Sequence, residues 1–255
     1  MKKFVLCAVA ALTAGAVLAE SEFNRPYFTR ENRHPDAGAW EAGVFSEYSK
    51  IDESGNNKWA DWERKEFTAG VYARYGLLEN LTAYGKLPFG HVDSDINDKH
   101  TGIRDISLGL ELFAYEYTFE YPYVIPYVEL TLATGDDKYN LGRGETDFAF
   151  GTSIGTTVYE VYHYVLDGRY NVNYNDDGVF SLAASFIWDL SYKFSLMAEA
   201  KGTSEDIPGE SGAPVYFRGG MYYRATDQLC LAWYGGGAIN SNEKGMGAIR
   251  AAYLF

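Results

Sequence analysis

Apolar and polar side chains alternate with a period of two along almost the whole chain, and this pattern constrains the fold more than any other feature. The last segment shows it most clearly, with Ile249 and Tyr253 on one side and Ala248, Arg250 and Ala252 on the other. Successive side chains of a β-strand point to opposite faces. The pattern therefore predicts strands that have one apolar and one polar face.

About twelve alternating segments can be counted, and each has the length that crosses a bilayer when a strand is tilted. They fall near residues 38–50, 64–77, 80–91, 104–115, 121–134, 145–157, 160–173, 179–190, 192–202, 213–225, 227–238 and 245–255. Their connections are long and short in turn, as in IDESGNNKWADWE followed by LLEN. Long extracellular loops alternating with short periplasmic turns are typical of outer-membrane barrels. The predicted fold is an all-β membrane protein, a transmembrane antiparallel β-barrel of about 12 strands.

The start of the chain predicts export. Residues 1–19 have two lysines, an apolar run and a small residue at Ala19, which together are typical of a cleaved signal peptide. The apolar run is shorter than the roughly 20 residues that a membrane-spanning helix needs. We expect residues 20–36 to form a periplasmic N-terminal arm and residues 37–255 to form the barrel in the outer membrane of a Gram-negative bacterium.

The amino-acid composition limits the classes of partner that this protein is expected to bind. The formal net charge of -13 argues against nucleic acid. An exported barrel of this kind is expected to contact outer-membrane lipid and lipopolysaccharide and to be inserted by the barrel-assembly machinery. We expect a monomer that handles a small-molecule solute, whose identity the sequence does not give. Of the two cysteines, Cys230 alone lies outside the predicted signal peptide, so no intramolecular disulfide is expected.

Ionisable residues recur on the polar faces of the predicted strands. Charged side chains are costly against lipid, so these residues are expected to face the barrel interior. The candidate lumen-lining residues are Arg74, Lys86, Glu111, Glu129, Asp147, His163, Asp167, Arg169, Glu199, Arg218, Arg224 and Arg250. They either line a water-filled pore or pair with one another as a polar plug. Barrels of about eight strands are filled and those of about sixteen are open, so the strand number leaves both arrangements possible.

Three functions are compatible with such a barrel. A passive channel or transporter for small solutes is favoured, because glycine and alanine among the inward positions leave room. The alternative is a closed structural or adhesive barrel that acts through its acidic extracellular loops. The third is a barrel hydrolase, for which His163 is the candidate base, since Asp167 lies on the same face of its strand. We predict no enzyme activity, and no catalytic, cofactor-binding or metal site.

Three segments resemble the outer-membrane protein family of the phenol meta-cleavage pathway. They are YGLLENLTAYGKLPF (Tyr75 to Phe89), GIRDISLGLEL (Gly102 to Leu112) and TLATGDDKYNLGRGETDFAFGTSIG (Thr131 to Gly155). The family's Gly-x-x-Asp strand start is Gly102 to Asp105 here, its Thr-Gly-Asp motif begins at Thr134, and Ala133 replaces the usual proline. The resemblance implies a barrel that passes small, often apolar, compounds.

The end of the chain carries a further signal. Tyr253 and Phe255 lie on the same face of the last predicted strand, and Phe255 is the final residue. A terminal aromatic residue in this setting resembles the signal that the barrel-assembly machinery reads. We therefore predict that Tyr253 and Phe255 form the assembly signal.

Overall fold

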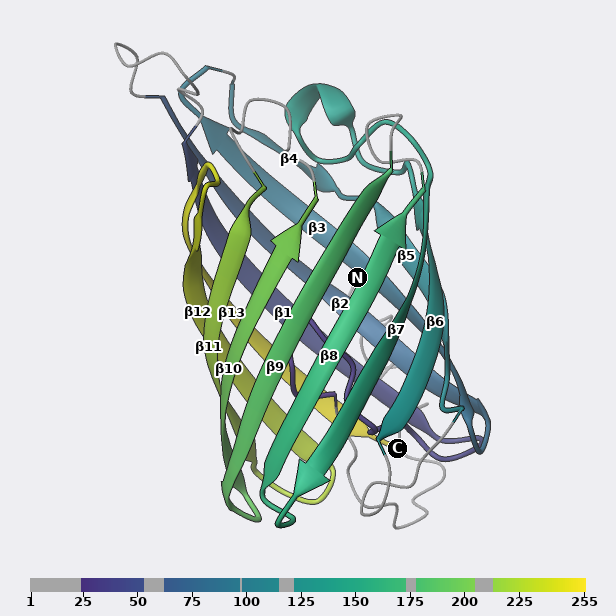
Figure 1. Ribbon diagram of the computed structural model, residues 1–255. Helices are drawn as coiled ribbons and strands as arrows, with labels where there is room; N and C mark the ends of the chain where they lie inside the picture. Colours follow the sequence, from purple (N-terminus) through teal and green to yellow (C-terminus); the bar gives the residue numbers. More distant parts are fainter. Residues whose placement is uncertain (1–23, 53–61, 97, 115–121, 173–177, 205–212) are drawn as a thin grey trace.

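The computed structural model describes residues 24–52, 62–96, 98–114, 122–172, 178–204 and 213–255, and these form one closed antiparallel sheet (Figure 1). β13 pairs with β1, and β2 pairs with β3, so the sheet closes on itself. The strands are β1 (Trp40–Asp52), β2 (Glu63–Leu78), β3 (Leu81–Ser94), β4 (His100–Ile103), β5 (Ile106–Leu112), β6 (Tyr123–Leu132), β7 (Asp147–Val158), β8 (Tyr162–Asn171), β9 (Val179–Ser191), β10 (Phe194–Thr203), β11 (Val215–Arg224), β12 (Leu229–Ile239) and β13 (Glu243–Leu254).

The wall has twelve members, as predicted. β4 and β5 both pair with β3, one beyond the other, through Phe89↔Ile103 and Lys86↔Ser107. They therefore occupy a single position in the wall. The sequence pattern started this strand at residue 104, whereas the structure shows that His100–Ile103 already pairs with β3.

The two faces of the sheet confirm the alternation read from the sequence. Val44, Val71 and Leu108 point outward and are 48–55% exposed, as expected for side chains that meet lipid tails. On β13, Ile249 is 48% exposed, whereas its neighbour Ala248 is 7% exposed and faces the interior. Closure removes the unpaired sheet edges, which could not be hydrogen-bonded in a bilayer.

The two ends of the barrel differ. One end carries tight turns, such as the one between β7 and β8, where Tyr159 and Glu160 have φ values of 52° and 62°. Two successive positive φ values are typical of a type I′ hairpin turn, which matches the twist of the strands. The other end carries longer loops and the short 3₁₀ helix η1 (Asp137–Tyr139) (Figure 1). No helix in the described ranges is long or apolar enough to cross a bilayer.

The N-terminal arm lies in a different place from the one expected. The predicted signal peptide, residues 1–19, and residues 20–23 of the arm lie outside the described residues. Residues 24–36 were expected in the periplasm, but the structure places their first part inside the barrel, where Arg25 bonds to Ser195 of β10 and Arg30 to Glu111 of β5. This position of the arm has an electrostatic cause, because the arm brings Arg30 to the buried carboxylates of Glu111 and Asp167 in the wall.

Candidate functional site in the barrel lumen

Glu199 on β10 holds the backbone of the arm. The amide of Tyr27 donates to Oε1 of Glu199 at 2.7 Å, and the amide of Phe28 donates to Oε2 at 2.8 Å. Glu199 is 5% exposed, and Ser185 on the neighbouring strand β9 also donates to it. Both oxygens of a buried carboxylate are thus used by two consecutive amides, which fixes the height of the arm in the barrel.

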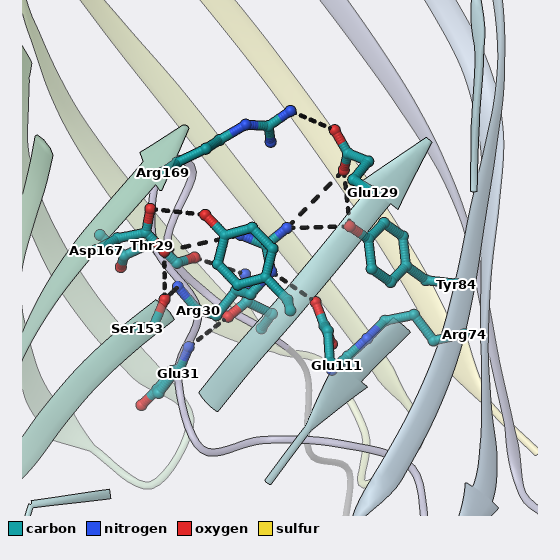
Figure 2. Close-up of polar contacts among 12 residues, drawn as sticks. Thr29, Arg30, Glu31, Arg74, Tyr84, Glu111, Glu129, Ser153, Asp167 and Arg169 are labelled. Carbon is teal, nitrogen blue, oxygen red and sulfur yellow. Dashed lines mark hydrogen bonds and ion pairs between the residues drawn. The ribbon is translucent and has the colours of Figure 1, made fainter. Parts of the chain in front are cut away.

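Arg30 is the central contact of the arm (Figure 2). Its Nε donates to Glu111 Oε1 at 2.9 Å, and its Nη atoms lie 3.9 Å from Glu129 and 3.8 Å from Asp167. The guanidinium stacks over the ring of Tyr127 at 3.3 Å from the centroid. A single arginine therefore interacts with carboxylates on three strands, β5, β6 and β8, and with a ring of β6.

A second cluster anchors the beginning of the arm. Arg25 donates to Glu31 of the arm through Nε at 2.9 Å, and to Ser195 through Nη1 at 2.9 Å. Arg25 also pairs with Asp189 of β9, which in turn lies 2.8 Å from His163 Nε2. The arm thereby folds back on itself and joins a polar chain that runs along β8 to β10.

These contacts explain why the arm enters the lumen. A buried carboxylate without a partner loses its hydration and becomes very costly, whereas a paired one is tolerated. Arg30 supplies the positive charge for Glu111 and Asp167, and Arg25 supplies it for Asp189. The arm thus supplies counterions for the wall, and Tyr27 adds apolar packing against the buried cluster of β9 to β13.

The structure brings most of the predicted lumen residues together. Arg74, Glu111, Glu129, Asp167, Glu199, Arg218 and Arg250 contact the arm through hydrogen bonds, ion pairs or rings, and His163 lies 3.7 Å from Glu31. Arg169 pairs with Glu129 at 2.7 Å. Asp147 pairs with Arg143 near the loop end, and Arg224 lies over the ring of Tyr192. Lys86 lines a cavity beside the arm.

Sequence reasoning missed the residues of the arm itself. Arg25, Arg30 and Glu31 lie in a segment without strand alternation, so the sequence pattern predicts that they lie outside the barrel. A usable signal was present, because residues 24–36 include the arginines Arg25, Arg30 and Arg33 next to a wall rich in inward carboxylates. That charge complementarity pairs groups distant in sequence, and only the closed barrel brings them into contact.

Asp105, part of the Gly-x-x-Asp motif, holds the loop between β6 and β7 by accepting hydrogen bonds from two of its backbone amides, an arrangement that we call the loop clasp. Its Oδ1 accepts from the Gly135 amide at 2.9 Å, and its Oδ2 accepts from the Arg143 amide at 2.8 Å. A Cβ on Gly142 would lie 2.5 Å from Asp105 Oδ1, so only glycine fits there without a shift. Two of the three segments that carry the family resemblance, Gly102 to Leu112 and Thr131 to Gly155, thus meet at the loop clasp.

Replacement of Asp105 by alanine is expected to loosen this loop while leaving the barrel closed. Two amides lose a charged acceptor, at a cost of about 1–3 kcal/mol. Hydrogen exchange should show protection of the Gly135 and Arg143 amides falling by roughly tenfold or more. Asp98→Ala, which removes an exposed carboxylate, is the matched control. Equal protection in D105A and D98A would contradict the clasp.

Glu31 makes the docking of the arm sensitive to acid. Burial alone would raise the pKa of Glu31, but its attraction to Arg25 and Arg33 and the hydrogen bonds from Arg25 lower it from 4.5 to about 2. A lowered pKa means that the contribution of Glu31 to docking is complete above about pH 4.5 and is lost as the pH falls towards 2. The docked arm should therefore be stable at neutral pH.

We accordingly expect the ionic conductance of the full chain to rise as the pH is lowered below about 4.5, because protonation of Glu31 weakens docking. Glu31→Gln removes this titration. It should conduct more than the unaltered chain at neutral pH, and its acid response should be smaller. Single-channel recordings at graded pH measure both effects. Superimposable pH curves for the two proteins would show that Glu31 does not hold the arm.

Many solved structures are similar to this chain, among them the following three. The COG4313 outer membrane channel from Pseudomonas putida F1 has a TM-score of 0.71 at 18% identity, over 88% of this chain and 99% of that chain. The beta domain of the Bordetella autotransporter Brka has a TM-score of 0.55 at 11% identity, over 86% and 99%. The translocator domain of the autotransporter NalP from Neisseria meningitidis has a TM-score of 0.50 at 15% identity, over 87% and 89%. At these identities the likeness shows the fold, that of an outer-membrane barrel.

Sequence comparison supplies the family. No curated protein matches the chain. A family model matches residues 49–251, most of the barrel, and includes the three segments that carried the resemblance. The chain therefore belongs to the family described as "Putative MetA-pathway of phenol degradation".

Proposed function

We propose that this protein is a passive outer-membrane channel for small solutes, and that its N-terminal arm occupies the lumen in the resting state. The observation that carries the proposal is the way the barrel is filled. Charged side chains line the inner face of the wall. Their partners come from the arm, a segment that is not one of the wall strands but lies inside the barrel. A segment held by polar contacts can be replaced by water and solute far more readily than side chains packed into a core.

The comparisons support the same proposal. The similar structure from Pseudomonas putida F1 is named an outer membrane channel. The outward apolar face fits a lipid environment, in which the barrel would contact lipid and lipopolysaccharide. Cleavage after Ala19, insertion by the barrel-assembly machinery and a monomeric state complete the proposal.

The two alternative functions are less well supported. A closed structural barrel would account for the paired charges, but a core built from the wall's own side chains would serve equally well without an arm. A hydrolase would need His163 as a free base. Instead, His163 Nδ1 lies 2.9 Å from Thr157 Oγ1 and Nε2 lies 2.8 Å from Asp189, which also binds Arg25. This arrangement favours an anchor for the arm, and we propose that the protein is not an enzyme.

A reversible lock tests the channel and the arm together. Thr29 Oγ1 and Ser185 Oγ are 2.9 Å apart, so cysteines at these positions place two sulfurs close enough to bond. We would combine Thr29→Cys and Ser185→Cys with Cys230→Ala, so that one cysteine pair remains in the mature chain. Uptake of small uncharged solutes into liposomes should be slow in the oxidised protein and faster after reduction.

Each single-cysteine variant, also in the Cys230→Ala background, serves as the control for the lock. Neither single variant should respond to the reductant, since neither can form the bond. A folded protein that gives no solute uptake in the oxidised state, in the reduced state and after removal of the arm would overturn the channel proposal. Uptake that is fast and equal in both redox states would keep the channel but contradict a closing role for the arm.

A further inference from the structure

A cavity of about 280 Å³ lies between the arm and one side of the barrel wall. The arm borders it through Tyr27, Phe28 and Arg30, and strands β1, β2 and β3 border it on the other side. The opposite side of the lumen is filled by a cluster of inward apolar residues on β9 to β13. Open space next to the docked arm is therefore concentrated on the side of β1 to β3.

The charges that border this cavity do not balance. The charged lining residues are Arg30, Arg74, Lys86, Arg169, Arg250, Glu41, Glu47, Glu111 and Glu129. Arg30, Arg74 and Arg169 are paired with Glu41, Glu111 and Glu129. Within the described residues, neither Lys86 nor Arg250 has a carboxylate at ion-pair distance. Glu47 accepts a hydrogen bond from the Tyr27 hydroxyl at 2.7 Å and is the one acid left to oppose them among these lining residues. The lining carries one excess positive charge inside a protein whose net charge is -13.

The two unpaired cations are presented differently. Lys86 lies directly across from Tyr72 in the β2–β3 register, and its side chain is reached by solvent. Arg250 donates to the carbonyl of Pro26 at 3.4 Å and lies over the rings of Tyr27 and Tyr234, at 4.9 Å and 5.1 Å from their centroids. Lys86 is therefore free to meet a ligand, whereas Arg250 is held in place by the arm.

Aromatic rings supply the apolar part of the lining. Tyr27, Phe28, Phe45, Tyr72 and Tyr84 border the cavity. A cavity of roughly 150 Å³ is enough to hold benzene, so this one has room for a substituted ring. Aromatic side chains favour a flat apolar body, while the excess charge favours a single negative group.

We propose that this cavity binds a small aromatic carboxylate, with its carboxylate at Lys86 and Arg250 and its ring against the tyrosines. A monoanion would neutralise the excess charge of the lining. The site is complete only when the arm is docked, because Tyr27 and Phe28 form one of its walls. The role of the site in transport rests on the proposed channel, but binding can be measured without transport.

Calorimetric titration of the full mature protein in nanodiscs tests the proposal, with benzoate as the probe. Benzyl alcohol and benzylamine are the matched neutral and cationic compounds. Benzoate should bind at least about tenfold more tightly than either of them. Lys86→Gln and Arg250→Gln should each weaken benzoate binding by about tenfold, the effect of losing one charged hydrogen bond.

Lys138→Gln is the control variant, because it removes one positive charge from an exposed residue of η1 that does not border the cavity. It should leave benzoate affinity unchanged. Removal of residues 24–36 should abolish binding. If Arg250→Gln fails to fold, Lys86→Gln still tests the site, because among the described residues the Lys86 side chain makes no hydrogen bond or ion pair that the substitution would break.

Equal binding of benzoate and benzyl alcohol, or an unchanged affinity in Lys86→Gln, would overturn the aromatic carboxylate site. That failure is distinguishable from failure of the channel. Solute uptake without benzoate binding keeps the channel and rejects the site, whereas benzoate binding without solute uptake keeps the site and rejects the channel.

Discussion

Deletion of residues 24–36 is expected to raise the single-channel conductance by on the order of tenfold, because it removes the segment that fills the lumen. Arg30 alone bridges carboxylates on three strands, and Tyr27 and Phe28 occupy both oxygens of Glu199. Without the arm these carboxylates must be hydrated, so water enters the space that the arm leaves. Planar-bilayer recordings of both proteins measure the change.

Two matched variants sharpen this experiment. Deletion of residues 20–23 shortens the chain by a smaller amount but leaves every described arm contact, and it should conduct like the unaltered protein. Arg30→Ala removes the central ion pairs but keeps the arm, and it should give more frequent openings of intermediate duration. Equal conductance of the unaltered protein and of the variant that lacks residues 24–36 would show that the arm does not block the lumen.

Deletion of Phe255 is expected to reduce the amount of folded barrel in the outer membrane by more than about tenfold. The Phe255 amide donates to the Trp40 carbonyl at 2.7 Å, and the Trp40 amide donates to the Phe255 carbonyl at 3.4 Å. These bonds lie at the seam where β13 meets β1 and the sheet closes. The ring of Phe255 also packs on Tyr253, at 4.6 Å between centroids. We propose that assembly in the cell depends on this terminal aromatic.

The heat-modifiable band of the folded barrel on gels measures this loss. Phe255→Tyr keeps an aromatic ring and both seam hydrogen bonds, so it should assemble almost normally. Refolding of purified protein into detergent separates recognition from stability. The deletion removes only the last bonds of a long seam, so refolding there should be affected far less than assembly in cells. Normal membrane insertion of the deletion variant would exclude Phe255 as an assembly signal.

The orientation of side chains in the wall could be predicted from sequence because it depends on neighbouring residues only. Ile249 and Ala248 alternate because consecutive strand residues must face opposite sides. An inward Glu199 or Arg74 was expected because lipid does not tolerate either charge. The same local argument counted twelve wall members and located the turn at Tyr159.

The partners of those side chains could not be predicted in the same way. Glu199 bonds to the amides of Tyr27 and Phe28, which lie more than 170 residues earlier in the chain. Asp105 joins Gly135 and Arg143 across two strands, so the family motifs gained a structural meaning only when they met. Periodicity specifies the face of each residue but not which residue lies opposite it across the lumen.

The sequence by itself determined the barrel, its inward charges and its closing strand, since each follows from alternation, length and the cost of charge in lipid. Tertiary structure alone decided how the lumen is filled. Whether the inward charges line an open pore or pair with one another in a filled lumen depends on the position of the arm. The sequence of the arm has no strand periodicity from which this position could be predicted. Arg30 reaches Glu111, Glu129 and Asp167 because the closed wall holds these acids around one point, and that arrangement exists only after closure.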